Sequence, residues 1–265
     1  MTATIGRQAA TPTWTSSALV LTKLTAVSAN FNDTTGSEAA TGLGATYASF
    51  VPLLRSATAT IDALWKANSA PIAGTAAAVN LTPDYYSSGT GQPVIGLTDY
   101  SLNMAWAPLE ISSGSDATFD ASFLPDALVW GGSLNLRLDD TEPLTKAQLA
   151  GDTAIDAAFV MDGSHSYTGN IWITGTAKGS TVGATNTQSF TYQGTGPLTS
   201  VGTHNFFAAG ALNTPPTAEE LVLTYATGRT VTGDAFPSAV NMTVSRNAII
   251  RVGITAQYTG AVVTA

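Results

Sequence analysis

Side chains alternate between apolar and polar along many short segments of this chain. Residues 133–138, 187–192 and 240–246 each place an apolar side chain at about every second position. Successive side chains of a strand point to opposite faces, so this period of two is typical of a strand with one buried face. Similar alternation marks residues 24–31, 57–65, 78–82, 100–106, 169–176, 220–225 and 249–258. Because Gly, Asn and Pro clusters separate these segments, the pattern predicts an antiparallel β-sandwich or barrel.

One short helix is expected beside the sheet. Thr141 can cap its start, Glu142 favours the positive end of the helix dipole, and Pro143 is tolerated in the first turn. Residues 144–149 continue the pattern and Gly151 ends it. The predicted fold class is therefore mainly β, with one short flanking helix and long loops.

Composition restricts the classes of function. The 10 Lys plus Arg residues against 18 Asp plus Glu give a net charge of −8, and only 11% of the residues are charged. Ten cations spread along the chain form no basic stripe, which argues against tight nucleic-acid binding. A surface with so few charges suggests that other subunits cover part of it. The chain has no Cys, which excludes disulfides and thiolate metal sites.

Targeting and membrane signals are not seen in the sequence. The apolar residues 18–21 are followed by Lys23 and fall far short of the roughly 20 residues of a membrane span. The N-terminus also lacks the pattern of a secretory signal peptide. We expect a protein without membrane contact that is made and kept in a cytoplasm until release.

Residues with catalytic potential are few. His165 follows Asp162 and Ser164 in a segment that predicts a hairpin turn, and sequence neighbours seldom provide the geometry of a catalytic triad. His204 lies in a predicted loop. The carboxylate pairs Asp139 with Asp140 and Glu219 with Glu220 are adjacent, so the members of a pair do not share a cleft. We therefore predict no catalytic residue, no metal site and no cofactor, and we expect that the protein is not an enzyme.

Several segments, taken in order, resemble the major tail tube proteins of long-tailed bacteriophages. They are residues 115–120, 167–174 and 190–198, with a fainter match at residues 47–56. The resemblance implies a two-sheet β-sandwich with a flanking helix and a long loop or hairpin that reaches a neighbouring subunit. It also implies stacked rings that form a tube for DNA ejection, in a phage tail assembled in the cytoplasm of a bacterial host. The loop and packing residues expected to meet a neighbour are Gly36, Gly42, Gly44, Tyr47 and Phe50.

A loose internal repeat suggests that the chain holds two such domains. Residues 30–33 resemble residues 118–120, and residues 107–109 resemble residues 196–198. We accordingly expect a first tail-tube-like domain at 1–108, a second at 109–200, and a C-terminal β segment at 201–265 that completes the second domain or decorates the outside. Rings would then hold three chains, or six if each chain is one domain. Other tail proteins are further expected partners, and DNA would pass an acidic, hydroxyl-rich bore without specific binding.

Two alternative functions stay open at this point. One is a decoration or cement protein of the capsid, which would bind preformed capsids and not polymerise by itself. The other is a carbohydrate-binding β-sandwich that recognises a host. Trp172 is the candidate ligand surface for the second alternative, because Asn170 and Thr174 share its face of a predicted strand.

Overall fold

The described part of the chain folds almost entirely into β-strands. The computed structural model describes residues 11–14, 16, 18–39, 50–67, 70–82, 94, 96–112, 121–137, 154–182, 184–202, 206–207, 211–226 and 228–265. Within these ranges the helical element is a single 3-10 turn, η1 (Leu21–Lys23). The strands are β1 (Thr11–Trp14), β2 (Leu24–Ala39), β3 (Phe50–Ala67), β4 (Ala70–Pro71), β5 (Ala78–Thr82), β6 (Leu97–Glu110), β7 (Phe123–Arg137), β8 (Ile155–Val160), β9 (His165–Gly179), β10 (Thr187–Gly202), β11 (Glu219–Ala226), β12 (Arg229–Ser245), β13 (Arg251–Tyr258) and β14 (Val263–Thr264).

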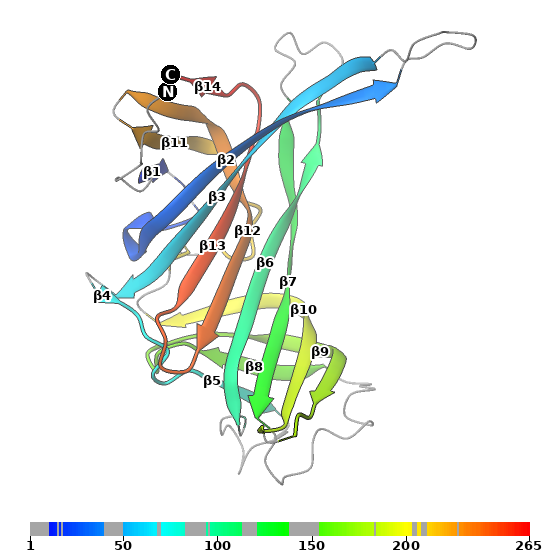
Figure 1. Cartoon of the computed structure of the whole chain (residues 1–265), viewed down its shortest axis with the longest axis vertical. Coiled ribbons are helices and arrows are strands. Elements are labelled where there is room, and N and C mark those ends of the chain that lie inside the picture. Colours follow the sequence, from blue (N-terminus) through cyan, green and yellow to red (C-terminus); the bar gives the residue numbers. More distant parts are fainter. Residues whose placement is uncertain are drawn as a thin grey trace.

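Antiparallel pairing joins these strands into one extended sheet. Its order is β2-β3-β13-β12-β6-β7-β10-β9-β8-β5, with β11 and β14 also paired to β12, β1 paired to β11, and β4 paired to β3 (Figure 1). The predicted mainly β, antiparallel fold class is confirmed. The helix expected over residues 141–150 lies outside the described residues.

The sheet runs across both of the predicted domain boundaries. Near Pro108, β6 continues its pairing with β7, and the segment after residue 200 provides β12 and β13 in the middle of the sheet. Strand pairing alone does not decide whether the chain evolved from tandem domains, so the division at residues 108 and 200 stays a prediction.

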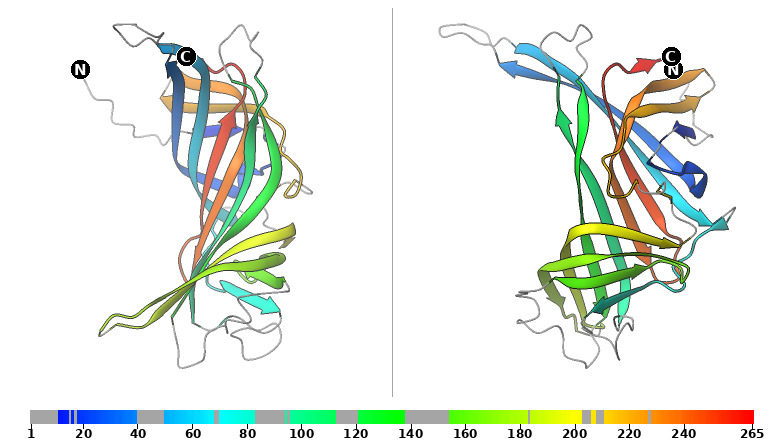
Figure 2. Two further views of the ribbon diagram at one scale, coloured as in Figure 1. Left: turned by 90° about the vertical axis from the view of Figure 1, so that its right-hand side faces the viewer. Right: turned by 180° about the vertical axis from the view of Figure 1, so that it is seen from behind.

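A bend in β9 and β10 folds the sheet into two layers. β10 pairs with β7 only from Thr187 to Gln193, and beyond a register shift between Thr195 and Thr199 it continues beside β9 alone. Figure 2 shows β8, β9 and β10 crossing the long strands at a steep angle. The first layer consists of β2, β3, β13, β12, β6 and β7, and the second of β5, β8, β9 and the end of β10.

Alternation in the sequence corresponds to alternating burial in the strands. In β7 Leu134 and Leu136 are buried, and in β12 Val240, Met242 and Val244 are buried, whereas their direct neighbours are not. Burial of these side chains on one face is the main stabilising contribution, at about 1.5–3 kcal/mol for each large one.

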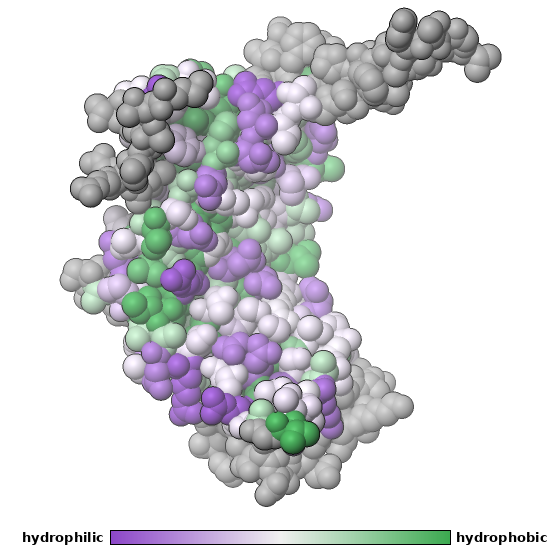
Figure 3. Space-filling model, viewed as in Figure 1, coloured by the Kyte–Doolittle hydropathy of each residue, from purple (hydrophilic) through white to green (hydrophobic). Residues whose placement is uncertain are grey.

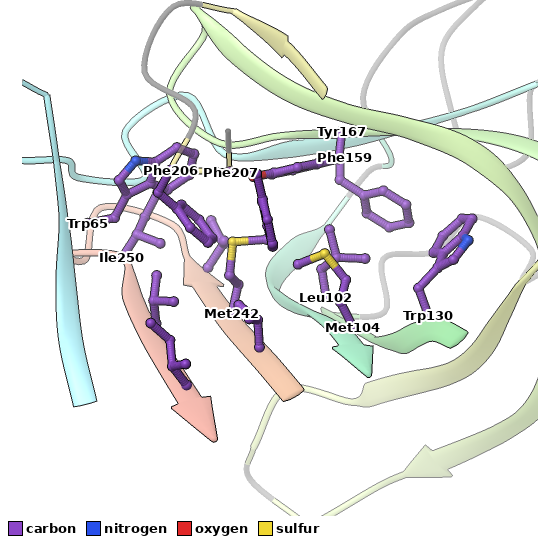
Figure 4. Packing of buried hydrophobic residues seen from close by; sticks show 14 of the residues in the cluster. Trp65, Leu102, Met104, Trp130, Phe159, Tyr167, Phe206, Phe207, Met242 and Ile250 are labelled. Atoms are coloured by element: carbon purple, nitrogen blue, oxygen red, sulfur yellow. The ribbon is translucent and has the colours of Figure 1, made fainter. Parts of the chain in front are cut away.

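Aromatic side chains fill the space between the two layers. Trp65 of β3 packs edge-on against Phe206 and His165, with ring centroids 5.4 and 4.9 Å apart. Tyr100 of β6 meets Phe159 of β8 at 5.8 Å. Figure 4 shows Phe206, Phe207, Tyr167 and Phe159 gathered over the side chains of the long strands. These contacts fix the second layer on the first.

Trp130 of β7 is held against the backbone of the bend. Its Nε1 donates to the carbonyl oxygen of Gly196 at 3.0 Å, and the Gln193 side chain donates to the Trp130 carbonyl oxygen at 2.8 Å. A Cβ at Gly194 would lie 2.1 Å from the indole, and one at Gly169 would lie 2.7 Å from it. Only glycine leaves room for the indole at these two positions.

Three buried tyrosines make the fold sensitive to alkali. Burial raises the pKa of Tyr100, Tyr167 and Tyr192 above the ordinary value of 10.0. The Tyr100 hydroxyl donates to the Val160 carbonyl oxygen and the Tyr192 hydroxyl to that of Ser101, each at 2.7 Å. Both acceptors bind the neutral phenol, so ionisation would also break these bonds.

We expect stability to fall steeply above pH 10. Below that pH the three phenols are protonated in the folded and unfolded states alike, so they add no pH dependence. Above it the unfolded chain releases protons that the folded chain keeps, which costs about 1.4 kcal/mol per pH unit for each tyrosine. Denaturant unfolding followed by circular dichroism from pH 8 to 12 measures this slope, and Tyr192→Phe should lower it by about 1.4 kcal/mol per pH unit. A free energy of unfolding that stays constant to pH 11.5 contradicts this assignment.

Candidate assembly surface

Hydroxyl and amide side chains cover the face of the first layer that points away from the core. Residues paired across antiparallel strands share a face, so the registers define rows across the sheet. One row, across β3, β13, β12, β6 and β7, consists of Asp62, Gly253, Asn241, Asn103 and Gly131. The next row, across β13, β12, β6, β7 and β10, consists of Arg251, Thr243, Ser101, Ser133 and Thr191. We call these two rows the polar face; Figure 3 shows hydrophilic and near-neutral residues over these strands.

Side chains of the polar face bond to one another. The hydroxyl oxygens of Ser101 and Ser133 are 3.0 Å apart, and Ser28 of β2 donates to Asp62 at 3.0 Å. Asp62 and Arg251 are the charged members of the two rows. A polyanion is held by clustered cations, which these rows do not provide. The polar face is therefore hydrophilic and carries no cluster of cations in its two rows.

The edge of β2 is open. β2 pairs with β3 from Leu24 to Ala39, and no other described strand pairs with it. Its outer N–H and C=O groups can therefore pair with a strand of another chain. Val27 is 47% exposed on this strand. Figure 1 shows that the ends of β2 and β3 project beyond the rest of the sheet.

A second open edge belongs to the first half of β7. β6 pairs with β7 as far as Phe123, but β10 covers β7 only from Gly131 onward. Among the described strands, nothing pairs with the other side of residues 123–130. Large apolar side chains surround this edge and are 50–60% exposed; they are Leu109, Ile111, Leu124 and Val129. We call these four residues the apolar margin, and such a patch on an open edge is typical of a protein interface.

Two of the residues expected to meet a neighbour, Gly36 and Phe50, lie in the projecting parts of β2 and β3. Gly36 lies at a register shift of β2, between Thr35 and Ser37, and Phe50 begins β3 opposite Ala39. Gly42, Gly44 and Tyr47 lie outside the described residues. Their contact with a neighbouring subunit stays a prediction.

Trp172 lies at the bend of β9. Its backbone is in register with Gln193 of β10, and its side chain is partly exposed. Asn170 shares its face, and the Thr174 hydroxyl lies 3.2 Å from that of Thr191. A role for Trp172 in ligand binding stays a prediction at this point.

His165 is a core residue, so its placement in a hairpin turn was wrong. It begins β9 in register with Gly202 and is 2% exposed, whereas the turn is formed by residues 161–164. Its Nε2 lies 3.3 Å from the Ser200 hydroxyl oxygen. Ser164 donates instead to Asp162, from its N–H at 3.0 Å and its hydroxyl at 3.1 Å. The three residues therefore form a turn and a buried contact, without the hydrogen bonds of a triad. His204 lies outside the described residues.

The described residues show neither a metal cluster nor a membrane-spanning helix. No three His, Asp or Glu side chains come together there in a way that could hold a metal ion. The described residues also contain no helix of the length and hydropathy needed to cross a bilayer.

Comparison with known proteins finds similarity at the level of structure. No protein-family model matches the chain, and no curated protein matches its sequence. Among solved structures, the chain is similar to the SPP1 tail tube, determined by solid-state NMR and cryo-EM, with a TM-score of 0.35 and 15% identity. The match covers 54% of this chain and 87% of the other. A TM-score this low assigns neither a family nor a function.

Proposed function

We propose that this chain is a structural subunit that polymerises by pairing the open edge of β2 with the open edge of β7 in the next copy. The single observation that carries this proposal is the position of the two edges. They lie at opposite margins of one layer, separated by β3, β13, β12 and β6. A contact between two different edges is head-to-tail, and such contacts generate rings or open filaments.

We propose that this polymer is a phage tail tube, because several segments of the sequence resemble tail tube proteins. Rings of six copies, or of three if the chain holds tandem domains, stack into a tube in the virion after assembly in a bacterial cytoplasm. Other tail proteins would meet the ends of the tube. A structural subunit of this kind requires no catalytic side chain, so we also propose that the protein is not an enzyme.

In this proposal the polar face lines the bore. Duplex DNA carries one negative charge per roughly 1.7 Å of its axis, so a lining of clustered cations would retain it. Two rows of hydroxyl and amide groups, in which Asp62 accepts from Ser28 and Arg251 is the one cation, leave DNA free to move. The net charge of −8 favours the same outcome.

Electron microscopy tests polymerisation, and cross-linking tests which edges meet. Purified protein is expected to convert from monomers or small oligomers into tubes of uniform width. The chain has no Cys, so Val27→Cys in one copy and Val129→Cys in another are unique reactive sites. A flexible bis-maleimide is expected to link a mixture of the two variants, assembled together, into chain dimers.

Two results would count against the proposal. Particles that stay dispersed under every condition, with or without a tail-tip nucleus, contradict polymerisation and favour a capsid decoration protein if they bind capsids. Cross-linking of Val27→Cys alone, at the yield of the mixture, shows that like edges meet and contradicts the head-to-tail contact.

A further inference from the structure

A groove lies on the outer face of the second layer, beyond the bend that ends the polar face. Its volume is about 470 Å³, within the range of small-ligand sites. One row of side chains crosses it from β5 to β10, and the registers of these strands align its members. The row consists of Thr82, Asp156, Asn170 and Thr195. Ala157, Ala158 and Gly169 also line the groove, and their small side chains leave it hollow.

Polar side chains of the groove have unused hydrogen-bonding groups. In the described part of the chain, the side chains of Asp156, Asn170, Thr168 and Thr195 make no hydrogen bond with one another or with other residues. The Oδ1 atom of Asn80, which also lines the groove, is buried and has no partner there. On the polar face, Ser101 contacts Ser133 and Ser28 donates to Asp62. Asp156, Asn170 and Thr195 are exposed, so their polar groups are free to bind a polar ligand that enters the groove.

The lining also restricts the chemistry of the ligand. It contains no Lys, Arg or His, so an anionic ligand has no countercharge. Its one carboxylate, Asp156, is too few for a metal site, and no three potential ligand side chains come together in the described residues. Amide, carboxylate and hydroxyl groups in one row suit a neutral molecule that both donates and accepts hydrogen bonds.

Trp172 adds an aromatic surface beside this row. It lies on the same face of β9 as Asn170, two residues away, or about 6.6 Å along the strand. Its side chain is partly exposed, so part of its ring can contact the apolar C–H groups of a ligand. Adjacent strands are about 4.8 Å apart, so the row from Thr82 to Thr195 extends over about 14 Å.

We infer that this groove binds a neutral oligosaccharide, laid across β5, β8, β9 and β10 with one end beside Trp172. Asp156 and Asn170 bind sugar hydroxyls at the centre, and the threonines bind them at the sides. None of the groove's lining residues belongs to β2 or to the apolar margin, so binding is expected already in the monomer.

Titration of the full-length protein against defined sugars tests the inference. The first probe is an array of neutral glycans, and each neutral tetrasaccharide that binds is then titrated by NMR. A sulfated octasaccharide and CaCl₂ are each titrated in separate experiments. Asp156→Ala and Asn170→Ala are each expected to weaken binding at least tenfold, and Trp172→Ala severalfold. Asn103→Ala, an equally exposed amide of the polar face, is the matched control and should bind as the wild type does.

Each outcome bears on the site directly. Binding of a neutral glycan that Asp156→Ala and Asn170→Ala weaken, while their melting temperatures stay unchanged, supports it. An array without any neutral glycan signal overturns it, and so does binding that Asp156→Ala leaves intact. Binding of only the sulfated sugar or only calcium also overturns it, because the groove would then select a charge that its lining does not match.

Discussion

Replacing Leu124 and Val129 together by Lys is expected to abolish polymerisation while the monomer stays folded. Both side chains are more than half exposed in the monomer, so the substitutions remove little from its core. In the polymer they would be buried beside the edge of β2, where a large apolar side chain contributes about 1.5–3 kcal/mol. Losing about 3 kcal/mol from every contact raises the critical concentration more than a hundredfold, and the buried ammonium groups add to this. Sedimentation and negative-stain microscopy over a concentration series measure the change.

Ile249→Lys provides the matched control for this prediction. Ile249 is 49% exposed and bridges to Ala73 at the far end of the molecule from the apolar margin. It should polymerise as the wild type does. Tubes formed by the double-Lys variant at the wild-type critical concentration would show that the apolar margin is not an interface.

Gly194→Ala is expected to lower the free energy of unfolding by about 3 kcal/mol, at the upper end for overpacked cores. The new methyl carbon would lie 2.1 Å from the indole of Trp130. The indole is held in place, because its Nε1 is bonded to Gly196 and its six-membered ring also packs against Gly169. A loss of this size lowers the melting temperature by about 6–12 °C in a protein of this length. Thermal unfolding followed by circular dichroism gives the value.

Gly253→Ala separates this steric effect from the general effect of adding a methyl group in a strand. Gly253 lies in β13, and a Cβ there would come no closer than 3.8 Å to another residue. Alanine should be neutral or stabilise the strand by about 0.5–1 kcal/mol. If Gly194→Ala melts within a degree of wild type, Trp130 does not pack as described.

Local alternation was enough to predict most strands, because burial on one face follows directly from the period of two. It was not enough where small apolar residues occupy both faces of a strand. β8 has Ile155, Ala157 and Phe159 buried and Asp156 exposed, which is a period of two, but Ala158 among the outward positions weakens the contrast. His165 was misplaced for a related reason. Its polar ring continues the inward face of β9, yet polarity and a preceding glycine indicated a turn.

The candidate surfaces could not be predicted from local patterns, because an open edge depends on which distant strands fail to pair. Leu109 and Leu124 are directly opposite each other in the β6–β7 hairpin, and in the sequence they look like ordinary core residues. Their exposure follows from β10 turning away after Gln193. The groove likewise requires β5 to lie beside β8, a pairing of segments more than seventy residues apart.

The middle of the sheet is built from strands that come later in the chain than both of their flanking partners. β13 and β12 lie between β3 and β6, so these earlier strands have no partner on their inner sides until residues 229–258 have left the ribosome. A nascent chain therefore exposes two extra edges that disappear in the finished subunit. In the proposed assembly, growth through the two lateral edges can therefore begin in an ordered way only after translation has supplied β12 and β13 and closed these inner edges.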